Sequence, residues 1–224
     1  MRKINTNELK NLNINILVVG LGVTGVSVVD YFMKKKKKII VVDNRDNPPF
    51  LNEIRAKYPS LEINLGNYED KYFEWAQLLV MSPGVSLTTP QIDKAIKRGV
   101  AVIGDIELFL GEAKAPIVAI TGSNGKSTVT TLVGDMAKTS GLNVAIGGNI
   151  GIPALSLLNE NVEKYILELS SFQLETTHTL KAQVATVLNL QSDHLDRHVS
   201  FENYKKIKSK ILKGAEIGIY NADD

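Results

Sequence analysis

The stretch Ile14-Asn-Ile-Leu-Val-Val-Gly-Leu-Gly-Val-Thr-Gly25 places a short apolar segment directly before a glycine-rich turn. The glycines fit the spacing G-x-G-x-x-G, and Thr24–Met33 continues with the apolar pattern of a helix. Glycines permit a tight turn that lets the backbone approach a diphosphate, and the N–H groups that start the helix attract the anion. The order of strand, glycine turn and helix therefore predicts a nucleotide-binding domain with a parallel sheet.

Short β-branched stretches alternate with amphipathic ones along the rest of the chain. This alternation is typical of a parallel α/β sheet, whose buried strands are apolar on both faces. We predict further helices at Pro90–Arg98, Ser127–Thr139 and Phe201–Leu212. The predicted strands are Ile14–Val19, Ile39–Val42, Leu61–Asn64, Leu78–Met81, Ile117–Ile120, Lys164–Leu167, Val184–Leu188 and Ile217–Tyr220.

A second unit of strand, turn and helix follows the small, polar segment Gly111–Pro116, where we place a domain boundary. Its turn is Thr121-Gly-Ser-Asn-Gly-Lys-Ser-Thr128, which is shorter than the general P-loop because Ile120 stands where that loop has glycine. A Gly-Lys-Ser core provides N–H groups for phosphate oxygens, a lysine for the β/γ-phosphates and a hydroxyl for Mg²⁺. We expect an α/β protein with a Rossmann-like domain at residues 1–111 and an incomplete P-loop-type ATP-binding domain at residues 116–224. We also expect the chain to be truncated, because it stops directly after an apolar strand.

The composition is that of a soluble globular protein, with 44% hydrophobic and 22% charged residues. A net charge of +2 favours neither nucleic acid nor a membrane as a partner, and we expect the run Lys34–Lys38 to be a solvated loop. The absence of cysteine excludes disulfides and thiolate chemistry. Residues Ile4–Glu8 are polar where a signal peptide is apolar, and no stretch is long enough to span a membrane, so we expect a cytoplasmic protein.

Two groups of residues could complete the first nucleotide site. Asp43 ends the second predicted strand, where an acid could bind a ribose hydroxyl, but Asn44-Arg45 places a cation beside it. The turn Ser82-Pro-Gly84 follows the strand Leu78–Met81 at the sheet edge where ligands bind. An NAD site and a purely structural glycine turn remain open at this point.

A carboxylate and an imidazole follow the later strands of the second domain. Glu168 lies at the same predicted sheet edge as the phosphate loop and could bind Mg²⁺, which prefers oxygen ligands. Asp193-His194 follows the next strand, although a helix-capping or turn role explains each acid equally well. We expect His178 and His198 on the surface and Trp75 against the core.

Together these segments resemble the Mur ligase family over essentially the whole chain. The phosphate loop has the form Thr-Gly-x-Asn-Gly-Lys-[Ser/Thr] of that family, which accounts for its short spacing. Within the family, the chain resembles the member that adds D-glutamate to UDP-N-acetylmuramoyl-L-alanine. The segments that carry this resemblance are Gly20–Gly25, Met81–Gly84, Gly104–Phe109, Gly147–Gly151 and Leu167–Glu175, among which Ser170-Ser-Phe-Gln173 discriminates best.

The resemblance implies a role for individual residues. Val23, Thr24, Asn44, Arg45 and Ser82 would bind the uridine diphosphate end of the substrate, with Asn44 standing where the family often has threonine. Asn149 and His194 would face the muramoyl-alanine arm, and Lys126, Glu168, His194 and Lys208 would be catalytic. Ser127, Glu168, His194 and Lys208, the last as a carbamate, would hold Mg²⁺. ATP would bind to Gly122, Ser123, Asn124, Gly125, Lys126, Ser127 and Thr128.

The implied reaction is ATP-dependent amide formation through an acyl phosphate, in the synthesis of peptidoglycan precursors, by a monomer. The family's C-terminal ligase domain, with the D-glutamate site, is absent from the chain, so we expect this piece alone to be inactive. Two other hypotheses are a folylpolyglutamate-synthase-like ligase, which would lack the first glycine turn, and an NAD-dependent oxidoreductase or sensor. A noncatalytic nucleotide-binding scaffold is the third alternative.

Overall fold

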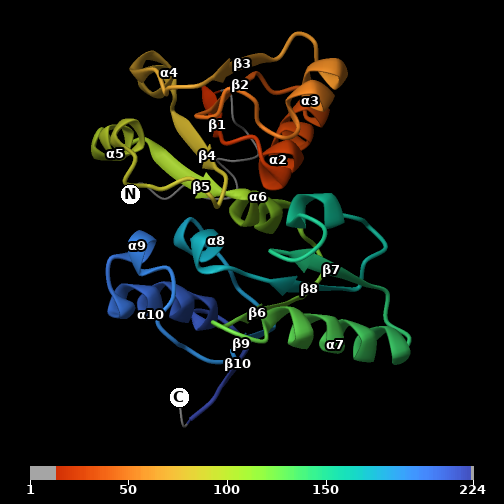
Figure 1. Cartoon of the computed structure of the whole chain (residues 1–224). Coiled ribbons are helices and arrows are strands. Elements are labelled where there is room, and N and C mark those ends of the chain that lie inside the picture. Colours follow the sequence, from red (N-terminus) through yellow and green to blue (C-terminus); the bar gives the residue numbers. More distant parts are fainter. Residues whose placement is uncertain (1–13, 223–224) are drawn as a thin grey trace. The chain divides into compact units, whose positions relative to one another are not determined.

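The computed structural model describes residues 14–222 and divides the chain into two compact units, Met1–Gly111 and Glu112–Asp224 (Figure 1). The polar segment Ile4–Glu8, on which the expected lack of a signal peptide rests, lies outside the described residues. So do the last two residues, which bear on the expected truncation. No helix in the described part is long and apolar enough to cross a membrane.

Unit 1 is a five-stranded parallel sheet with helices between successive strands. The strand order is β3-β2-β1-β4-β5, so the chain winds outward from β1 in one direction and then in the other. The strands are β1 (Ile16–Val19), β2 (Ile39–Asp43), β3 (Glu62–Leu65), β4 (Leu78–Met81) and β5 (Ala101–Gly104). The helices are α2 (Val23–Lys34), α3 (Leu51–Lys57), α4 (Asp70–Trp75), α5 (Pro90–Lys97) and α6 (Asp105–Glu112).

The position of β1 in the middle of this sheet follows from its composition. All four of its residues are buried, as a strand covered on both faces must be. Leu17 and Val19 join one core cluster with Val42, Leu79 and residues of α4 and α5. Trp75 packs against this cluster, as predicted. Ligands of such sheets bind at the carboxyl edge where the winding direction changes, which here lies between β1 and β4.

Unit 2 is a second five-stranded parallel sheet, in the order β10-β9-β6-β8-β7. Its first strand, β6, again lies in the middle. The strands are β6 (Ile117–Thr121), β7 (Val144–Gly148), β8 (Lys164–Glu168), β9 (Val184–Val187) and β10 (Ile217–Tyr220). The helices are α7 (Lys126–Thr139), α8 (Ser171–Glu175), α9 (Leu195–His198) and α10 (Phe201–Ser209), with short 3₁₀ helices η1 (Ala154–Leu157) and η2 (Lys210–Leu212).

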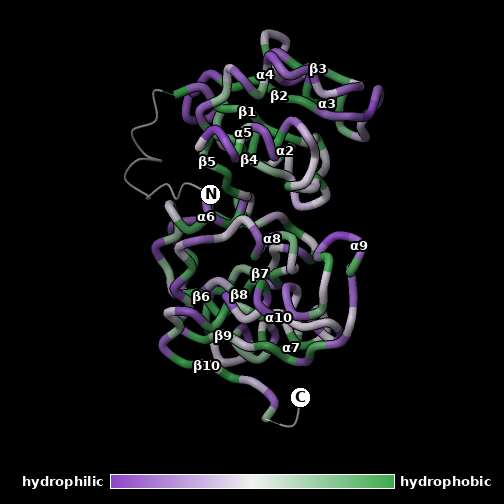
Figure 2. The backbone as a smooth tube through the Cα atoms, turned by 90° about the vertical axis from the view of Figure 1, so that its left-hand side faces the viewer, coloured by the Kyte–Doolittle hydropathy of each residue, from purple (hydrophilic) through white to green (hydrophobic). Residues whose placement is uncertain are grey.

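The structure confirms the predicted α/β class and every predicted strand to within two residues at each end. Figure 2 shows that the central strands of each sheet are hydrophobic, which is the signal that predicted them. Strands β5 and β7 were not predicted, because both end in glycine, which normally weakens a strand. The predicted helix Phe201–Leu212 ends at Ser209 and finishes as the 3₁₀ turn η2. Four of the five lysines in the run 34–38 are exposed, as expected.

Candidate functional site

The first glycine turn is held by the loop that follows β4. Gly20 has a φ of 96°, and the Ser82 hydroxyl donates to its carbonyl oxygen at 2.8 Å. A Cβ on Gly25 would lie 2.0 Å from that same carbonyl, so only glycine fits there. Nothing lies within 4 Å of a Cβ built on Gly22, which precedes α2. The turn therefore leaves open space beside the N–H groups that start α2, as an anion requires.

Asp43 stabilises this turn from inside the protein. Its buried carboxylate accepts hydrogen bonds from the Leu21 N–H at 2.6 Å and from the backbone and guanidinium of Arg45 at 2.6–2.9 Å. Burial by itself would raise the pKa of this carboxyl, but these hydrogen bonds outweigh it and hold the pKa below its ordinary value. Both oxygens are thus engaged by Leu21 and Arg45, so Asp43 acts here as a support of the turn and not as a free acceptor for a ribose hydroxyl.

A cavity of about 530 Å³ opens at the carboxyl edge of the unit 1 sheet. It is lined by residues that follow β2, β3 and β4, including Asn44, Tyr68, Gly84 and Gln91. Of the predicted substrate residues, Asn44 lines it and Arg45 follows Asn44 with its side chain half exposed. Val23 and Thr24 lie in the first turn of α2, and the Ser82 hydroxyl is hydrogen-bonded to the glycine turn. Tyr68 and Gln91 were not predicted, because no sequence motif marks them.

The second glycine turn connects β6 to α7 as the sequence predicted. Gly125, at the N-cap of α7, has a φ of 77°, and the N–H groups of Lys126, Ser127 and Thr128 have no partner within the helix. Ser127 and Thr128 are exposed, and the Lys126 ammonium donates to the Ser123 carbonyl at 2.9 Å. The turn thus presents free N–H groups and a cation together, which is the requirement for binding a polyphosphate.

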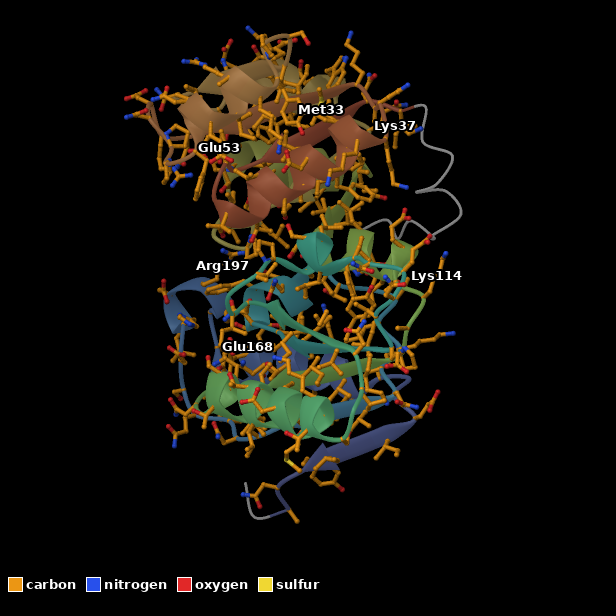
Figure 3. The ribbon with its side chains drawn as sticks, turned by 90° about the vertical axis from the view of Figure 1, so that its right-hand side faces the viewer. Met33, Lys37, Glu53, Lys114, Glu168 and Arg197 are labelled. Carbon is orange, nitrogen blue, oxygen red and sulfur yellow. The ribbon has the colours of Figure 1, made fainter. Side chains whose placement is uncertain are left out.

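Glu168 meets this loop from the end of β8. Its carboxylate is buried and accepts hydrogen bonds from the Ser127 hydroxyl at 2.7 Å and from the Asn149 amide at 2.6 Å. Ser127, Asn149 and Glu168, which were all predicted as site residues and come from three separate segments, therefore meet at the sheet edge. Figure 3 labels Glu168 among the side chains of unit 2.

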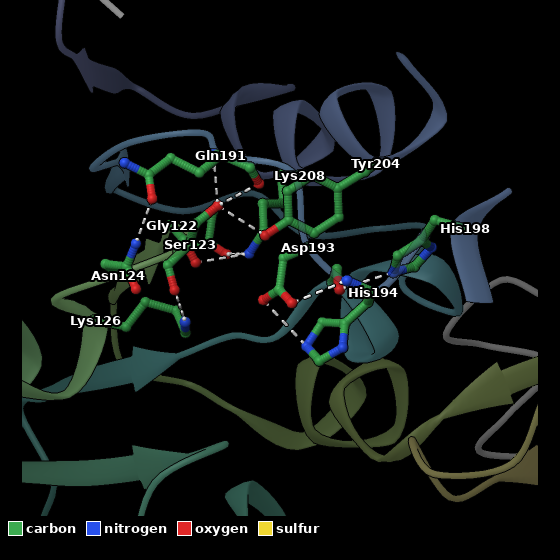
Figure 4. Close-up of polar contacts among 12 residues, drawn as sticks. Gly122, Ser123, Asn124, Lys126, Gln191, Asp193, His194, His198, Tyr204 and Lys208 are labelled. Carbon is green, nitrogen blue, oxygen red and sulfur yellow. Dashed lines mark hydrogen bonds and ion pairs between the residues drawn. The ribbon is translucent and has the colours of Figure 1, made fainter. Parts of the chain in front are cut away.

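Lys208 lies on the buried face of α10, beneath the phosphate loop (Figure 4). Its ammonium donates to the Gly122 carbonyl at 2.8 Å and to the Thr121 hydroxyl at 3.1 Å, and lies 5.0 Å from the centre of the Tyr204 ring. Burial, with the positive charge of Lys126 as the second cause, lowers the pKa of this ammonium to about 8. The Tyr204 hydroxyl also forms a hydrogen bond with the Ser123 hydroxyl at 2.9 Å, a contact that no sequence motif predicts.

The three histidines differ in their exposure. His194 is exposed at the start of α9, with its Nε2 3.3 Å from the Asp193 carboxylate, and no hydrogen bond within residues 14–222 joins it to Glu168. His198 is buried, and its Nε2 lies 2.9 Å from the Ser171 hydroxyl, so the surface prediction was wrong. Burial lowers the pKa of His198. His178 is half-buried.

No three His, Asp or Glu side chains within the described residues come close enough to form a metal-binding group on their own. Two side chains at the phosphate loop offer oxygen atoms that can bind a metal ion: the Ser127 hydroxyl and the Glu168 carboxylate, which are hydrogen-bonded to each other. Such oxygens fit Mg²⁺, which keeps several waters and takes only one or two carboxylates.

Comparison with known families matches both units. A model described as "Mur ligase MurD-like, N-terminal domain" matches residues 14–104, and one described as "Mur ligase middle domain" matches residues 120–224. The UDP-N-acetylmuramoylalanine–D-glutamate ligase of Haemophilus influenzae is 51% identical over 212 residues, which are 95% of this chain and 48% of that relative. The ligase of the same name from Escherichia coli K12 is 49% identical over 211 residues, covering 94% of this chain and 48% of the relative. The chain thus spans about half the length of the curated relatives it matches.

Two solved structures share the fold. One is the UDP-N-acetylmuramate:L-alanyl-γ-D-glutamyl-meso-diaminopimelate ligase of Neisseria meningitides, with a TM-score of 0.58 at 14% identity over 94% of this chain and 72% of that one. The other is the UDP-N-acetylmuramate–alanine ligase of Thermotoga maritima, with a TM-score of 0.56 at 20% identity over 95% of this chain and 50% of that one. At these identities the likeness concerns the fold alone.

Proposed function

Because this chain belongs to the Mur ligase family, we propose that it provides the substrate-binding and ATP-binding domains of a ligase that adds D-glutamate to UDP-N-acetylmuramoyl-L-alanine. The relatives that are about half identical to it carry the name of that ligase. The reaction forms an amide bond in a cytoplasmic precursor of peptidoglycan. The D-glutamate site would belong to a further domain, since the chain spans about half the length of these relatives.

The observation that carries this proposal is the contact between Glu168 and Ser127 at the phosphate loop. A phosphate loop alone would suit any nucleotide-binding protein. A buried carboxylate that reaches the loop hydroxyl, and is fixed from its other side by Asn149, adds an acidic group where a nucleotide-bound cation would lie. A passive binding scaffold has no need of such a group.

The first step would convert the alanine carboxylate of the substrate into an acyl phosphate. A carboxylate oxygen attacks the γ-phosphorus of ATP, the bond to the β-phosphate oxygen breaks, and ADP leaves. Negative charge spreads over the transferring phosphoryl group, and the protein contributes mainly by positioning and electrostatic stabilisation. Lys126 and the N–H groups of the first turn of α7 would supply the positive charge.

In the second step the amine of D-glutamate attacks the acyl carbon. The bond from carbon to the phosphate oxygen breaks, phosphate leaves, and the amine nitrogen loses a proton as the amide forms. We assign Asn149 and His194 to the muramoyl-alanine arm in these steps. We assign Val23, Thr24, Asn44, Arg45 and Ser82, with the cavity beside them, to the uridine diphosphate end.

Mg²⁺ would be held by Ser127 and Glu168, with His194 as a further ligand, and would neutralise charge on the phosphates. Lys208 would join this set only after its amine reacts with CO₂ to form a carbamate, which replaces a cation with an anion. The lowered pKa of Lys208 supports this role, because carbamate formation requires the neutral amine.

The two glycine turns distinguish this proposal from its alternatives. An NAD-dependent oxidoreductase would leave the phosphate loop of unit 2 without a function. It would also need an acid free to bind ribose, whereas Asp43 is engaged by Leu21 and Arg45. A folylpolyglutamate-synthase-like ligase would not be expected to open with unit 1, which matches a MurD-like N-terminal domain.

Thermal unfolding with three ligands in parallel tests the proposal. We expect UDP-N-acetylmuramoyl-L-alanine and Mg-ATP each to raise the melting temperature, since a ligand at about 100 times its Kd adds roughly 2.7 kcal/mol to the stability of the folded state. NADH should have no effect. A response to NADH alone would overturn the proposal. Amide synthesis from D-glutamate by the 224-residue chain would overturn the assignment of the D-glutamate site to a further domain.

A further inference from the structure

The segment Asn189–Gln191, which leaves β9, lies against the phosphate loop and bonds it at six points. The Ser123 N–H donates to the Asn189 carbonyl at 3.0 Å. The Gln191 N–H donates to the Ser123 hydroxyl at 2.9 Å, and that hydroxyl lies 3.1 Å from the Gln191 carbonyl. The Asn124 amide donates to the Gln191 side chain at 2.9 Å. No sequence motif singled out Asn189 or Gln191.

The Asn189 side chain makes the remaining two bonds, and both go to the backbone of one residue. Its Oδ1 accepts from the Asn124 N–H at 2.9 Å, and its Nδ2 donates to the Asn124 carbonyl at 3.1 Å. Among side chains of this length, only an amide carries a donor and an acceptor side by side. One side chain therefore fixes both backbone groups of residue 124, as a neighbouring strand would.

This pairing determines which N–H groups of the loop can reach a phosphate. Ser123 and Asn124 direct theirs to Asn189. The next residue, Gly125, adopts the left-handed conformation, after which α7 begins with its free N–H groups. With the backbone of Asn124 fixed, the turn at Gly125 and the start of α7 are fixed in direction as well.

We propose that Asn189 is a positioning residue that sets the backbone of the phosphate loop for nucleotide binding, with Gln191 in a smaller supporting role. The inference rests on the nucleotide site proposed for unit 2. The loop is joined covalently to β6 and α7, so we expect the sheet of unit 2 to form without the Asn189 side chain, at some loss of stability. Anion binding by backbone N–H groups does depend on it, because the donors must converge on one point.

The test is calorimetric titration of the 224-residue chain with Mg-ADP and, separately, with UDP-N-acetylmuramoyl-L-alanine. We expect Asn189→Ala to weaken Mg-ADP binding about tenfold and Gln191→Ala about threefold, in line with two hydrogen bonds lost against one. Affinity for the UDP-linked ligand should stay within about twofold in both, because its uridine diphosphate end is assigned to unit 1 and neither residue is assigned to its muramoyl-alanine arm.

Asn143→Ala is the matched control. The Asn143 amide also donates to a backbone carbonyl, that of Asn161 at 2.7 Å, but it lies just before β7, away from the phosphate loop. Since it removes one such hydrogen bond and not two, we expect it to lower the melting temperature no more than Asn189→Ala does, while leaving Mg-ADP affinity unchanged. Should Asn189→Ala fail to fold, Asn189→Asp keeps the acceptor, loses the donor and should also weaken Mg-ADP binding.

Three results would overturn the inference. If the unmodified chain binds no Mg-ADP, the proposed function fails and the positioning role fails with it. If the unmodified chain binds but Asn189→Ala stays within twofold of it, the positioning role alone fails. If Asn189→Ala weakens both ligands equally, the side chain supports the fold in general and not the phosphate loop.

Discussion

Lys208 shows how the surroundings of a residue prepare it for chemistry. A free lysine has a pKa of about 10.4, so almost none of it is neutral near pH 7. In unit 2 burial, together with the positive charge of Lys126, lowers the pKa of Lys208 to about 8, although the carboxylates of Asp193 and Glu168 act against this change. A sizeable fraction of the amine is then neutral at a pH where other lysines are charged.

We predict that Lys208 forms a carbamate whose amount rises as the pH passes from 7 to 9 at constant dissolved CO₂. The neutral amine is the reactive form, and its fraction grows as the pH rises through a pKa of about 8. Carbon-13 NMR of the chain with labelled CO₂ measures the carbamate signal. Lys208→Arg should remove the signal and Lys206→Arg, at an exposed position of the same helix, should retain it. A signal that persists in Lys208→Arg would contradict the assignment.

Asp43 is the second residue for which the surroundings decide the charge. Its pKa is below the ordinary value, so the ionised form stabilises the folded state above the ordinary pKa of about 3.9. That contribution is lost as the pH falls through the lowered pKa. The sequence placed Asp43 at a sheet edge but could not show that Leu21 and Arg45, and not a ligand, would be its hydrogen-bond partners.

We predict that Asp43→Asn lowers the free energy of unfolding of unit 1 by about 2 kcal/mol at pH 7, the usual range for hydrogen bonds to a charged group. The difference between the two proteins should shrink towards pH 3. Trp75 is the sole tryptophan, so its fluorescence during urea unfolding reports on unit 1. Asp70→Asn, which removes a surface pair with Lys94, should change little at either pH. An undiminished difference at pH 3 would refute the role of the charge.

At the scale of the elements, glycine decides how closely two strand ends approach. Gly148 ends β7 with a φ of 102°, and a Cβ there would lie 2.4 Å from the Glu168 carbonyl. This close approach lets the next residue, Asn149, donate to that carbonyl from its N–H and to the Glu168 carboxylate from its side chain.

We predict that Gly148→Ala displaces Glu168 and abolishes Mg-ADP binding, besides a strain cost of about 1–3 kcal/mol. Gly141→Ala is a matched control, since Gly141 also has a positive φ, of 89°, but a Cβ there meets nothing within 4 Å. It should lose stability through strain and still bind Mg-ADP. Thermal unfolding gives the stabilities and calorimetry the affinities. Equal nucleotide affinity in the two variants would rule out the placement of Glu168 at the nucleotide.

Elements with a strong periodic signal could be predicted from the sequence, and those with a weak one could not. Strands β1 and β4 are apolar throughout and β8 is apolar at its centre, so their burial was predictable. Strand β7 is only half-buried and ends in two glycines, which normally weaken a strand. The contact of Tyr204 with Ser123 joins residues 81 positions apart, and no local pattern reports such a pairing.

For the whole molecule, the two glycine turns lie in separate units, each at the edge of its own sheet, so the sites proposed for the uridine diphosphate end and for ATP can be tested separately. Gly25→Ala would place a Cβ against the Gly20 carbonyl and disrupt only the first turn. We predict that this variant loses binding of UDP-N-acetylmuramoyl-L-alanine and retains Mg-ADP affinity within about twofold. Calorimetry with each ligand measures the two affinities. Gly22→Ala is the control, because its Cβ would meet no protein atom and could only occupy space that the ligand uses. Loss of both ligands in Gly25→Ala would contradict separate sites.

The strand order has a consequence for how the protein emerges from the ribosome. In each unit the strand made first, β1 or β6, lies inside the sheet, between partners that come later in the chain. β1 pairs with β4, about sixty residues further on, and β6 pairs with β9 at a similar separation. Such distant parallel pairing is slow to form. Each nascent unit therefore leaves one edge of its first strand unpaired until most of that unit has been translated, and an unpaired apolar strand edge of this kind favours aggregation.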